Sequence, residues 1–233
     1  MLIAPDVYFY CFDCPETFGP PGGFSSNAVV LGGPEKIIVD PGTGFHWPEL
    51  KREMAADGLD PSEFKMALFT HCHPDHMDAG RFLYSEYGLP LALSGIEADF
   101  FRSRGACFYE NWNLPVPDFP LVELDEGPLG LADPGIRLYL TPGHSPGGLS
   151  LHWPERKLLI VGDTYFPGTI GAIDYPGGSG TAMYASVALL EGLDGVETVL
   201  CGHFGALAGR ERILANYGLL NAEIKEKKEA GIF

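Results

Sequence analysis

Histidine and aspartate are concentrated in one short stretch, Thr70–His76, which reads THCHPDH. In an extended segment residues two apart point the same way, so His71 and His73 can approach one cation together. Pro74 disfavours a helical backbone at His73 and keeps that pair extended. The chain then turns into a helix that presents the aspartate and the third histidine. Burying these polar groups without a ligand would cost free energy, so the stretch predicts a metal site.

Three further candidate ligands follow apolar runs later in the chain. His144 lies in the stretch TPGHSPG, Asp163 in a Gly-Asp-Thr turn, and His203 in a Gly-His turn. Functional residues are often placed in such turns on a rigid scaffold, although each turn alone is more often structural. The complete candidate set is His71, His73, Asp75, His76, His144, Asp163 and His203. A catalytic zinc commonly uses three protein ligands, so this set predicts two metal ions that share one carboxylate, with a water between them.

Short strands alternating with helices are expected to position these side chains. Apolar runs rich in branched and aromatic residues predict strands at Val7–Phe12, Ala28–Leu31, Lys36–Val39, Lys65–Phe69, Leu89–Leu93, Ile136–Leu140, Leu149–Trp153, Leu158–Val161 and Val199–Cys201. Helices are expected at Trp47–Asp57, Asp75–Tyr87, Ile96–Arg104, Thr181–Glu191 and Arg210–Glu229, and an ordered loop at Phe108–Pro120. This order predicts an α/β (α+β) protein, an αβ/βα sandwich of two sheets with helices outside, as one domain over residues 1–233.

Charge and composition narrow the classes of function. A formal net charge of −16 with scattered Lys and Arg argues against nucleic-acid binding, which needs basic residues to neutralise phosphates. The N-terminus lacks the features of a signal peptide, and no apolar stretch is long enough to span a bilayer. We therefore expect a cytoplasmic protein without membrane association that acts on a small molecule. The oligomeric state stays open, with a homodimer among the alternatives.

The five cysteines are odd in number and scattered, which argues against a disulfide framework. Cys11 and Cys14 form a lone C-x-x-C. Two buried thiols are the preferred interpretation, and a disulfide or a weak metal site stays open. Cys72 lies between two candidate ligands and is expected to point away from the metals.

The candidate ligands, together with Asp40, resemble the motifs of the metallo-β-lactamase superfamily, and the matching motifs run from Asp40 to His203. The resemblance implies the four-layer αβ/βα fold of that family and two divalent metal ions, with zinc expected and iron or manganese as alternatives. It would assign His71, His73 and His144 to one metal, Asp75, His76 and His203 to the other, and Asp163 to a bridge. Asp40 lies in an Asp-Pro-Gly turn and would orient the metal ligands without binding metal itself. An aspartate that only stabilises the turn or caps a helix fits the sequence nearly as well.

Within the superfamily, the segments TPGHSPG and GDTYFPGTIGAIDYPGG resemble the glyoxalase II-like branch. The implied reaction is attack of a hydroxide, held by two metals, on a thioester, ester or lactone, with Asp75 as the catalytic residue that orients the hydroxide. That branch often carries Lys or Arg after the Ile-Gly that follows the bridging position, where it helps to hold glutathione. This chain has Ala172 there, which puts a glutathione substrate in doubt. Tyr165 and His46 are candidate substrate contacts, although a packed aromatic is the preferred interpretation of Tyr165.

Other functions remain open on the same residues. Histidine and carboxylate ligands also suit iron, so an iron-dependent oxidoreductase similar to the persulfide dioxygenases is the main alternative. A lactonase acting on N-acyl homoserine lactones is a second. A metal-binding scaffold without activity is disfavoured by the intact ligand set. His152 alternates within a predicted strand and is expected at the surface.

Overall fold

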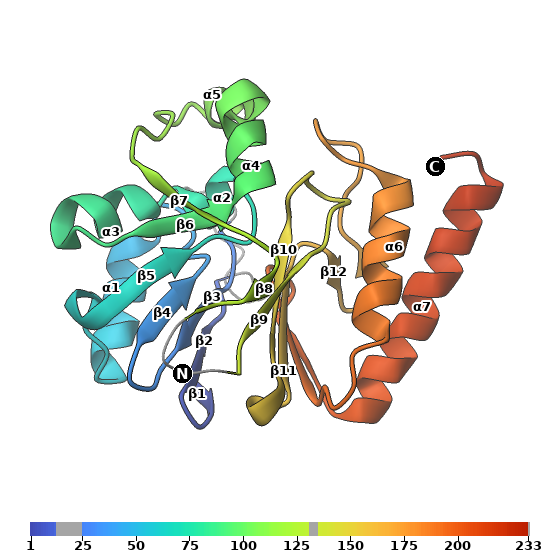
Figure 1. Ribbon diagram of the computed structural model, residues 1–233, viewed down its shortest axis with the longest axis horizontal. Coiled ribbons are helices and arrows are strands. Elements are labelled where there is room, and N and C mark those ends of the chain that lie inside the picture. Colours follow the sequence, from blue (N-terminus) through green and yellow to red (C-terminus); the bar gives the residue numbers. More distant parts are fainter. Residues whose placement is uncertain (13–24, 131–134, 233) are drawn as a thin grey trace.

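The computed structural model describes residues 1–12, 25–130 and 135–232. Two β-sheets face each other, and helices cover the outer face of each (Figure 1). The first sheet contains, in spatial order, β1 (Leu2–Ala4), β2 (Val7–Tyr10), β3 (Ala28–Leu31), β4 (Lys36–Val39), β5 (Phe64–Leu68), β6 (Leu91–Ser94) and β7 (Leu121–Leu124). The second contains β15 (Ala206–Ala208), β14 (Thr198–Cys201), β11 (Leu158–Gly162), β10 (Leu149–Trp153), β9 (Arg137–Leu140) and β8 (Gly127–Pro128). A small pair is formed by β12 (Tyr165–Phe166) and β13 (Thr169–Ile170).

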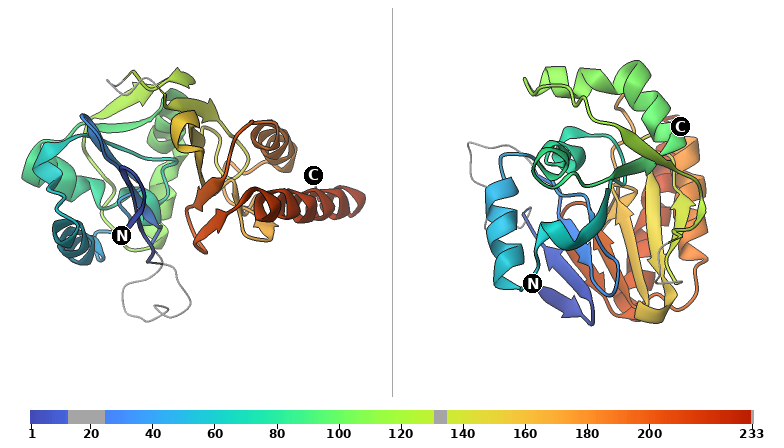
Figure 2. Two further views of the ribbon diagram at one scale, coloured as in Figure 1. Left: turned by 90° about the horizontal axis from the view of Figure 1, so that it is seen from below. Right: turned by 60° about the vertical axis from the view of Figure 1, so that its left-hand side comes forward.

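The helices divide between the two outer faces. The first sheet is accompanied by α1 (Trp47–Ala56), α2 (Pro74–Met77), α3 (Gly80–Tyr87), α4 (Gly95–Phe100) and α5 (Ala106–Asn111). The second is covered by α6 (Gly180–Glu191) and α7 (Arg210–Glu229), as Figure 2 shows from two further directions. Short 3-10 turns occur at η1 (Pro61–Glu63) and η3 (Pro154–Arg156).

Alternation along the strands explains the layers. In β4, Ile37 and Val39 pack into the core between the sheets, whereas Ile38 packs against the outer helices. In β11, Ile160 faces the core between the sheets and Leu159 faces α6 and α7. Successive strand side chains point to opposite faces, so strands covered on both sides read as continuous apolar runs. The predicted four-layer αβ/βα sandwich is confirmed.

The helix predicted over Asp75–Tyr87 is interrupted between α2 and α3. The carbonyl of Asp75 accepts a hydrogen bond from the Ser26 N–H at 2.9 Å, and the Ala79 N–H donates to the Gly42 carbonyl at 2.8 Å. These two groups would bond each other in a continuous helix. Both are diverted to loops from elsewhere in the chain, so the single-helix prediction was wrong for a tertiary reason.

Further expectations are corrected. The helix predicted to end at Arg104 continues through a π-helical segment, η2 (Phe101–Gly105), into α5, so the predicted loop at Phe108–Pro120 begins as a helix. His152, expected at the surface, is buried because β10 lies between two neighbouring strands with both faces covered. Cys72 lies in the core beneath the outer helices, away from the candidate ligands, as expected. Cys11 is disulfide-bonded, so its preferred interpretation as a thiol was wrong; Cys14 lies outside the described residues.

Strands that the sequence did not predict lie at the edges or are very short, such as β7, whose Val122 is 45% exposed. Their mixed polarity hides them from a search for apolar runs. None of the helices in the described ranges is both long and apolar enough to cross a bilayer.

Candidate metal centre

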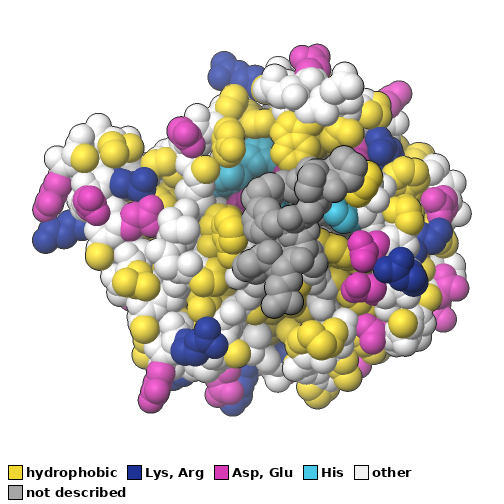
Figure 3. Space-filling view, turned by 180° about the vertical axis from the view of Figure 1, so that it is seen from behind, with side chains coloured by type: hydrophobic (Ala, Val, Ile, Leu, Met, Phe, Trp, Pro, Cys, Tyr) yellow, Lys and Arg dark blue, Asp and Glu magenta, His cyan; other side chains and the backbone are white. Residues whose placement is uncertain are grey.

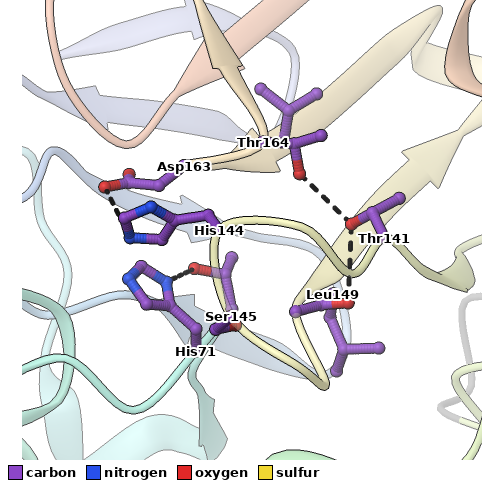
Figure 4. A pocket seen from close by; sticks show the side chains of 10 residues that line it. His71, Thr141, His144, Ser145, Leu149, Asp163 and Thr164 are labelled. Atoms are coloured by element: carbon purple, nitrogen blue, oxygen red, sulfur yellow. Dashed lines mark hydrogen bonds and ion pairs between the residues drawn. The ribbon is translucent and has the colours of Figure 1, made fainter. Parts of the chain in front are cut away.

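The candidate ligands lie in loops at the carboxyl ends of strands. β4 runs parallel to β5, and β11 runs parallel to β14, so the loops that follow each pair meet at one edge. The stretch Thr70–His76 follows β5, while Asp163 and His203 follow β11 and β14. His144 follows β9. Both sheets thereby deliver ligands to one place, and Figure 4 shows His71, His144 and Asp163 side by side there.

All of the candidate ligands are buried, with at most 8% of any residue exposed. Their ligand atoms form three groups, each within 4.8 Å: His71, His73 and His144; Asp75, His76 and His203; and His71, His76 and Asp163. Asp163 Oδ1 lies 3.3 Å from His76 Nε2, and its Oδ2 lies 3.7 Å from His144 Nε2. Because one carboxylate reaches both triads, the arrangement can hold two cations that share it.

Asp40 determines which ring nitrogen carries a proton in His76 and, through Thr70, in His71. Its Oδ2 lies 2.9 Å from His76 Nδ1 and also accepts the Thr70 hydroxyl at 2.7 Å. A carboxylate can only accept, so Nδ1 of His76 carries a proton, and the ring would bind a metal through Nε2 once that atom gives up its own proton. The Thr70 hydroxyl, having donated to Asp40, accepts from His71 Nδ1 at 3.1 Å. One carboxylate therefore leaves both Nε2 atoms able to bind a metal.

The ring of His144 is oriented by a backbone carbonyl. Its Nδ1 lies 2.7 Å from the Ala172 oxygen, an obligatory acceptor, so Nδ1 carries the proton. The Nε2 of His144 then presents a lone pair 3.0 Å from His73 Nδ1. The main-chain oxygen of Ala172 therefore positions a candidate ligand.

Several buried atoms in this centre lack hydrogen-bond partners. His71 Nε2, His73 Nε2 and Asp163 Oδ1 are enclosed without one. A buried polar atom left unsatisfied costs about 1–3 kcal/mol. His71 and Asp163 also belong to the groups whose ligand atoms converge, so a cation there would satisfy them and the residues present fit bound metal ions.

The pKa values of two candidate ligands, His73 and His76, also favour bound metal ions. Burial lowers the pKa of His73 to about 3, so this ring is neutral at pH 7 and free to bind a metal. Burial also lowers the pKa of His76, but Asp163 and two further carboxylates outweigh it and raise that pKa well above its ordinary value. The carboxylate cluster therefore favours positive charge at its centre, which metal ions would supply.

Glu97 ties together the two loops that carry the first triad, and the sequence analysis missed it. Its side chain is fully buried; Oε1 accepts the Cys72 N–H at 3.1 Å and Oε2 accepts the Gly147 N–H at 2.7 Å. Cys72 sits between two candidate ligands, and Gly147 follows His144 by three residues. A signal existed: Ser94 and Glu97 have the spacing of a helix capping box after a strand. Here Ser94 accepts the Glu97 N–H, while the Glu97 carboxylate bonds the ligand loops instead.

We expect Glu97→Gln to weaken metal binding by about 10–100-fold, the usual effect of losing a group that positions ligands. An amide has one acceptor oxygen, so one of the two backbone N–H groups would face an NH₂ donor. Metal affinity measured by chelator competition, with circular dichroism as a check on folding, tests this. Glu123→Gln, on an exposed carboxylate paired with Arg102, is the matched control. Equal affinities for both variants would refute the positioning role.

Neither of the two candidate substrate contacts, Tyr165 and His46, lines the cleft next to the candidate ligands. Tyr165 is 1% exposed, and its hydroxyl lies 2.9 Å from that of Tyr217 within the core beneath α6 and α7. The chain turns at Asp163 and Thr164, and Tyr165 at the start of β12 packs into the core instead of lining the cleft, which disfavours a substrate contact. His46 is not among the described residues that line the cleft; its Nδ1 lies 3.0 Å from the Thr43 hydroxyl.

Tyr165→Phe is therefore expected to leave kcat/KM unchanged. The variant removes one buried hydrogen bond to Tyr217, which should lower the free energy of unfolding by about 1 kcal/mol. Urea unfolding together with steady-state kinetics measures both quantities. A large loss of kcat/KM without a change in stability would return Tyr165 to the site.

A cleft of about 1040 Å³ opens over the metal centre. Of the candidate ligands, His73, Asp75, His144, Asp163 and His203 line it. Figure 3 shows histidine side chains at the surface with hydrophobic side chains beside them. A solute in the cleft can therefore reach the buried ligands directly.

Comparison with known proteins gives a consistent picture. The family model described as the metallo-beta-lactamase superfamily matches residues 21–203. A probable metallo-hydrolase of Methanocaldococcus jannaschii is 29% identical over 72% of this chain and 81% of its own. A hydroxyacylglutathione hydrolase of Brucella anthropi is 30% identical over 70% of this chain and 60% of its own. The crystal structure of TTHA1623 in a di-iron-bound form superposes with a TM-score of 0.70 at 28% identity, covering 86% of this chain and 94% of that one.

Proposed function

Because the chain belongs to the metallo-β-lactamase superfamily, we propose that it is a hydrolase that uses two divalent metal ions to cleave a thioester, ester or lactone. The observation that carries this proposal is the position of Asp163, whose carboxylate lies within 4 Å of candidate ligands from both triads, His144 in one and His76 and His203 in the other. A carboxylate within reach of both triads can bridge two metal ions. The intact ligand set at the floor of an open cleft supports an enzyme rather than a structural metal protein.

The residues divide the work as follows. His71, His73 and His144 would hold one metal, Asp75, His76 and His203 the other, and Asp163 both. When bound, the two ions would lower the pKa of a water and polarise a substrate carbonyl. Asp75 would orient that water and accept its proton. The charges of His76 and His203 lower the pKa of Asp75 despite burial, so the carboxylate is an ionised acceptor at pH 7.

Zinc is the metal we propose, since imidazole and carboxylate ligands suit it and hydrolysis needs no redox change. The same ligands suit iron, and the relative TTHA1623 is described in a di-iron-bound form. Iron would not by itself exclude hydrolysis, because the proposal depends on two cations and not on their identity.

Metal quantification on protein from its native host, combined with a panel of thioesters, esters and lactones, tests the proposal. We expect close to two metal ions per chain and metal-dependent hydrolysis of at least one of these classes. S-lactoylglutathione belongs in the panel, since a relative is a hydroxyacylglutathione hydrolase. One iron per chain, with oxygen consumption on a persulfide and no hydrolysis, would instead establish the oxidoreductase alternative.

A further inference from the structure

Aromatic side chains from both halves of the chain form the walls of the cleft. They are Phe45, Phe108, Trp112, Phe166, Tyr175 and Phe204. Phe108 and Tyr175 pack on the ring of His73, with centroid distances of 4.2 and 5.7 Å. Phe166 packs on the ring of His203 at 5.9 Å. Each triad is therefore bordered by an aromatic wall that begins at a candidate ligand.

These walls contain both buried and exposed aromatic side chains. Phe108 and Phe166 are each 7% exposed, whereas Trp112 and Tyr175 are 41% and 52% exposed. Phe45 is 58% exposed on the same rim. Several large exposed hydrophobic groups around one cleft are unusual for a solvated surface and typical of a binding site for an apolar group.

The described residues that line the cleft offer few positively charged side chains to an anionic substrate. Among the described lining residues, Arg81 is the one Lys or Arg. Its guanidinium pairs with Asp78 at 3.1 Å and lies over the ring of Phe82 at 4.8 Å. Asp78 itself lines the cleft with Asp75 and Asp163. Asp75 and Asp163 belong to the candidate centre, where two divalent cations would offset their charge. Outside that centre Arg81 is already paired with Asp78, so a carboxylate or phosphate at the far end of the substrate would find no unpaired Lys or Arg among the described lining residues.

From these contacts we infer that the cleft selects an uncharged ester, thioester or lactone with a long apolar acyl group, and that Trp112 is a specificity-determining residue. This inference rests on the proposed function and names its substrate class. The scissile carbonyl would lie over the metal centre, and the acyl chain would run outward between the aromatic walls. The volume of the cleft, about 1040 Å³, matches that of pockets which enclose a drug-sized ligand.

Chain-length dependence provides the test. For 4-nitrophenyl esters from acetate to octanoate, kcat/KM of the metal-loaded protein should rise about threefold per methylene, the effect of removing that group from water. 4-Nitrophenyl pentanoate should be preferred by at least tenfold over the mono-4-nitrophenyl ester of glutarate, which has the same acyl length and a terminal carboxylate. A flat series, or preference for the glutarate ester, would overturn the inference while leaving hydrolysis established.

Trp112→Ala should flatten the rise between hexanoate and octanoate. Tyr84→Ala is the matched control, because Tyr84 is also 41% exposed but does not line the cleft; its chain-length dependence should equal that of the wild type. If Tyr84→Ala flattens the series as much as Trp112→Ala does, the effect is not specific to the walls and the inference fails.

Binding keeps the inference testable without turnover. Alkyl hydroxamic acids bind metals through their head group, and calorimetry on the metal-loaded protein gives their Kd. We expect Kd to fall about threefold per methylene from acetohydroxamic to octanohydroxamic acid, and Trp112→Ala to reduce that gain. If binding follows chain length but no ester, thioester or lactone is cleaved, the proposed hydrolysis fails and the apolar cleft stands. If Kd does not change with chain length, the apolar cleft fails.

Discussion

Replacing His73 by alanine is expected to lower kcat/KM for hydrolysis by roughly 10³-fold, the scale of losing a group that stabilises the transition state. His73 lies in the first triad, and its Nε2 is enclosed without a hydrogen-bond partner. Its loss should remove one metal ion and leave the other triad intact. Kinetics and metal stoichiometry are the measurements, and circular dichroism should show an unchanged fold.

His46→Ala is the control for that variant. His46 is partly exposed and hydrogen-bonded to Thr43, and it is not among the described residues lining the cleft. Its kcat/KM and metal content should match those of the wild type. Full turnover by His73→Ala with one metal missing would contradict a dinuclear mechanism, and full metal content would contradict the ligand assignment.

Removal of metal is expected to abolish hydrolysis and to lower the melting temperature. A ligand present at about 100 times its Kd stabilises the folded state by about 2.7 kcal/mol, which corresponds to roughly 5–10 °C in a protein of this size. The apo-protein also keeps buried lone pairs without partners at His71 and His73. Dialysis against a chelator, followed by calorimetry and assay, measures both effects.

Zinc, iron and manganese should then be restored separately. Recovery of both activity and melting temperature with at least one of them is the expected result. Hydrolysis that persists after complete removal of metal would contradict the proposed mechanism, whatever the stability of the apo-protein.

The sequence was informative about the metal centre because its chemistry is encoded locally. The stretch Thr70–His76 follows the end of β5 and combines a bend with the start of a helix within seven residues, so the backbone itself brings several donors together. The four-layer fold followed from a similar local signal, the alternation between apolar runs and helical patterns. Both features can be recognised in the sequence because they depend on residues that are only a few positions apart.

The features that the sequence did not reveal depend on partners far along the chain. The break between α2 and α3 exists because Ser26 and Gly42 take the hydrogen bonds that would have continued the helix. The Glu97 carboxylate accepts hydrogen bonds from Cys72 and Gly147, which lie 25 and 50 residues away in the sequence. Tyr165 follows Asp163 by two residues across a turn, and its ring lies in the core that forms beneath α6 and α7.

By itself, the sequence determined which residues can bind metal and the type of fold that carries them, since donor chemistry and hydrophobic period are properties of residue type and short-range order. Only the tertiary structure decided that Asp163 faces both triads, that Asp40 and the Ala172 carbonyl set the histidine tautomers, and that aromatic walls border the ligands. Those contacts join segments distant in sequence. Their geometry is set by how two sheets pack, which no local pattern specifies.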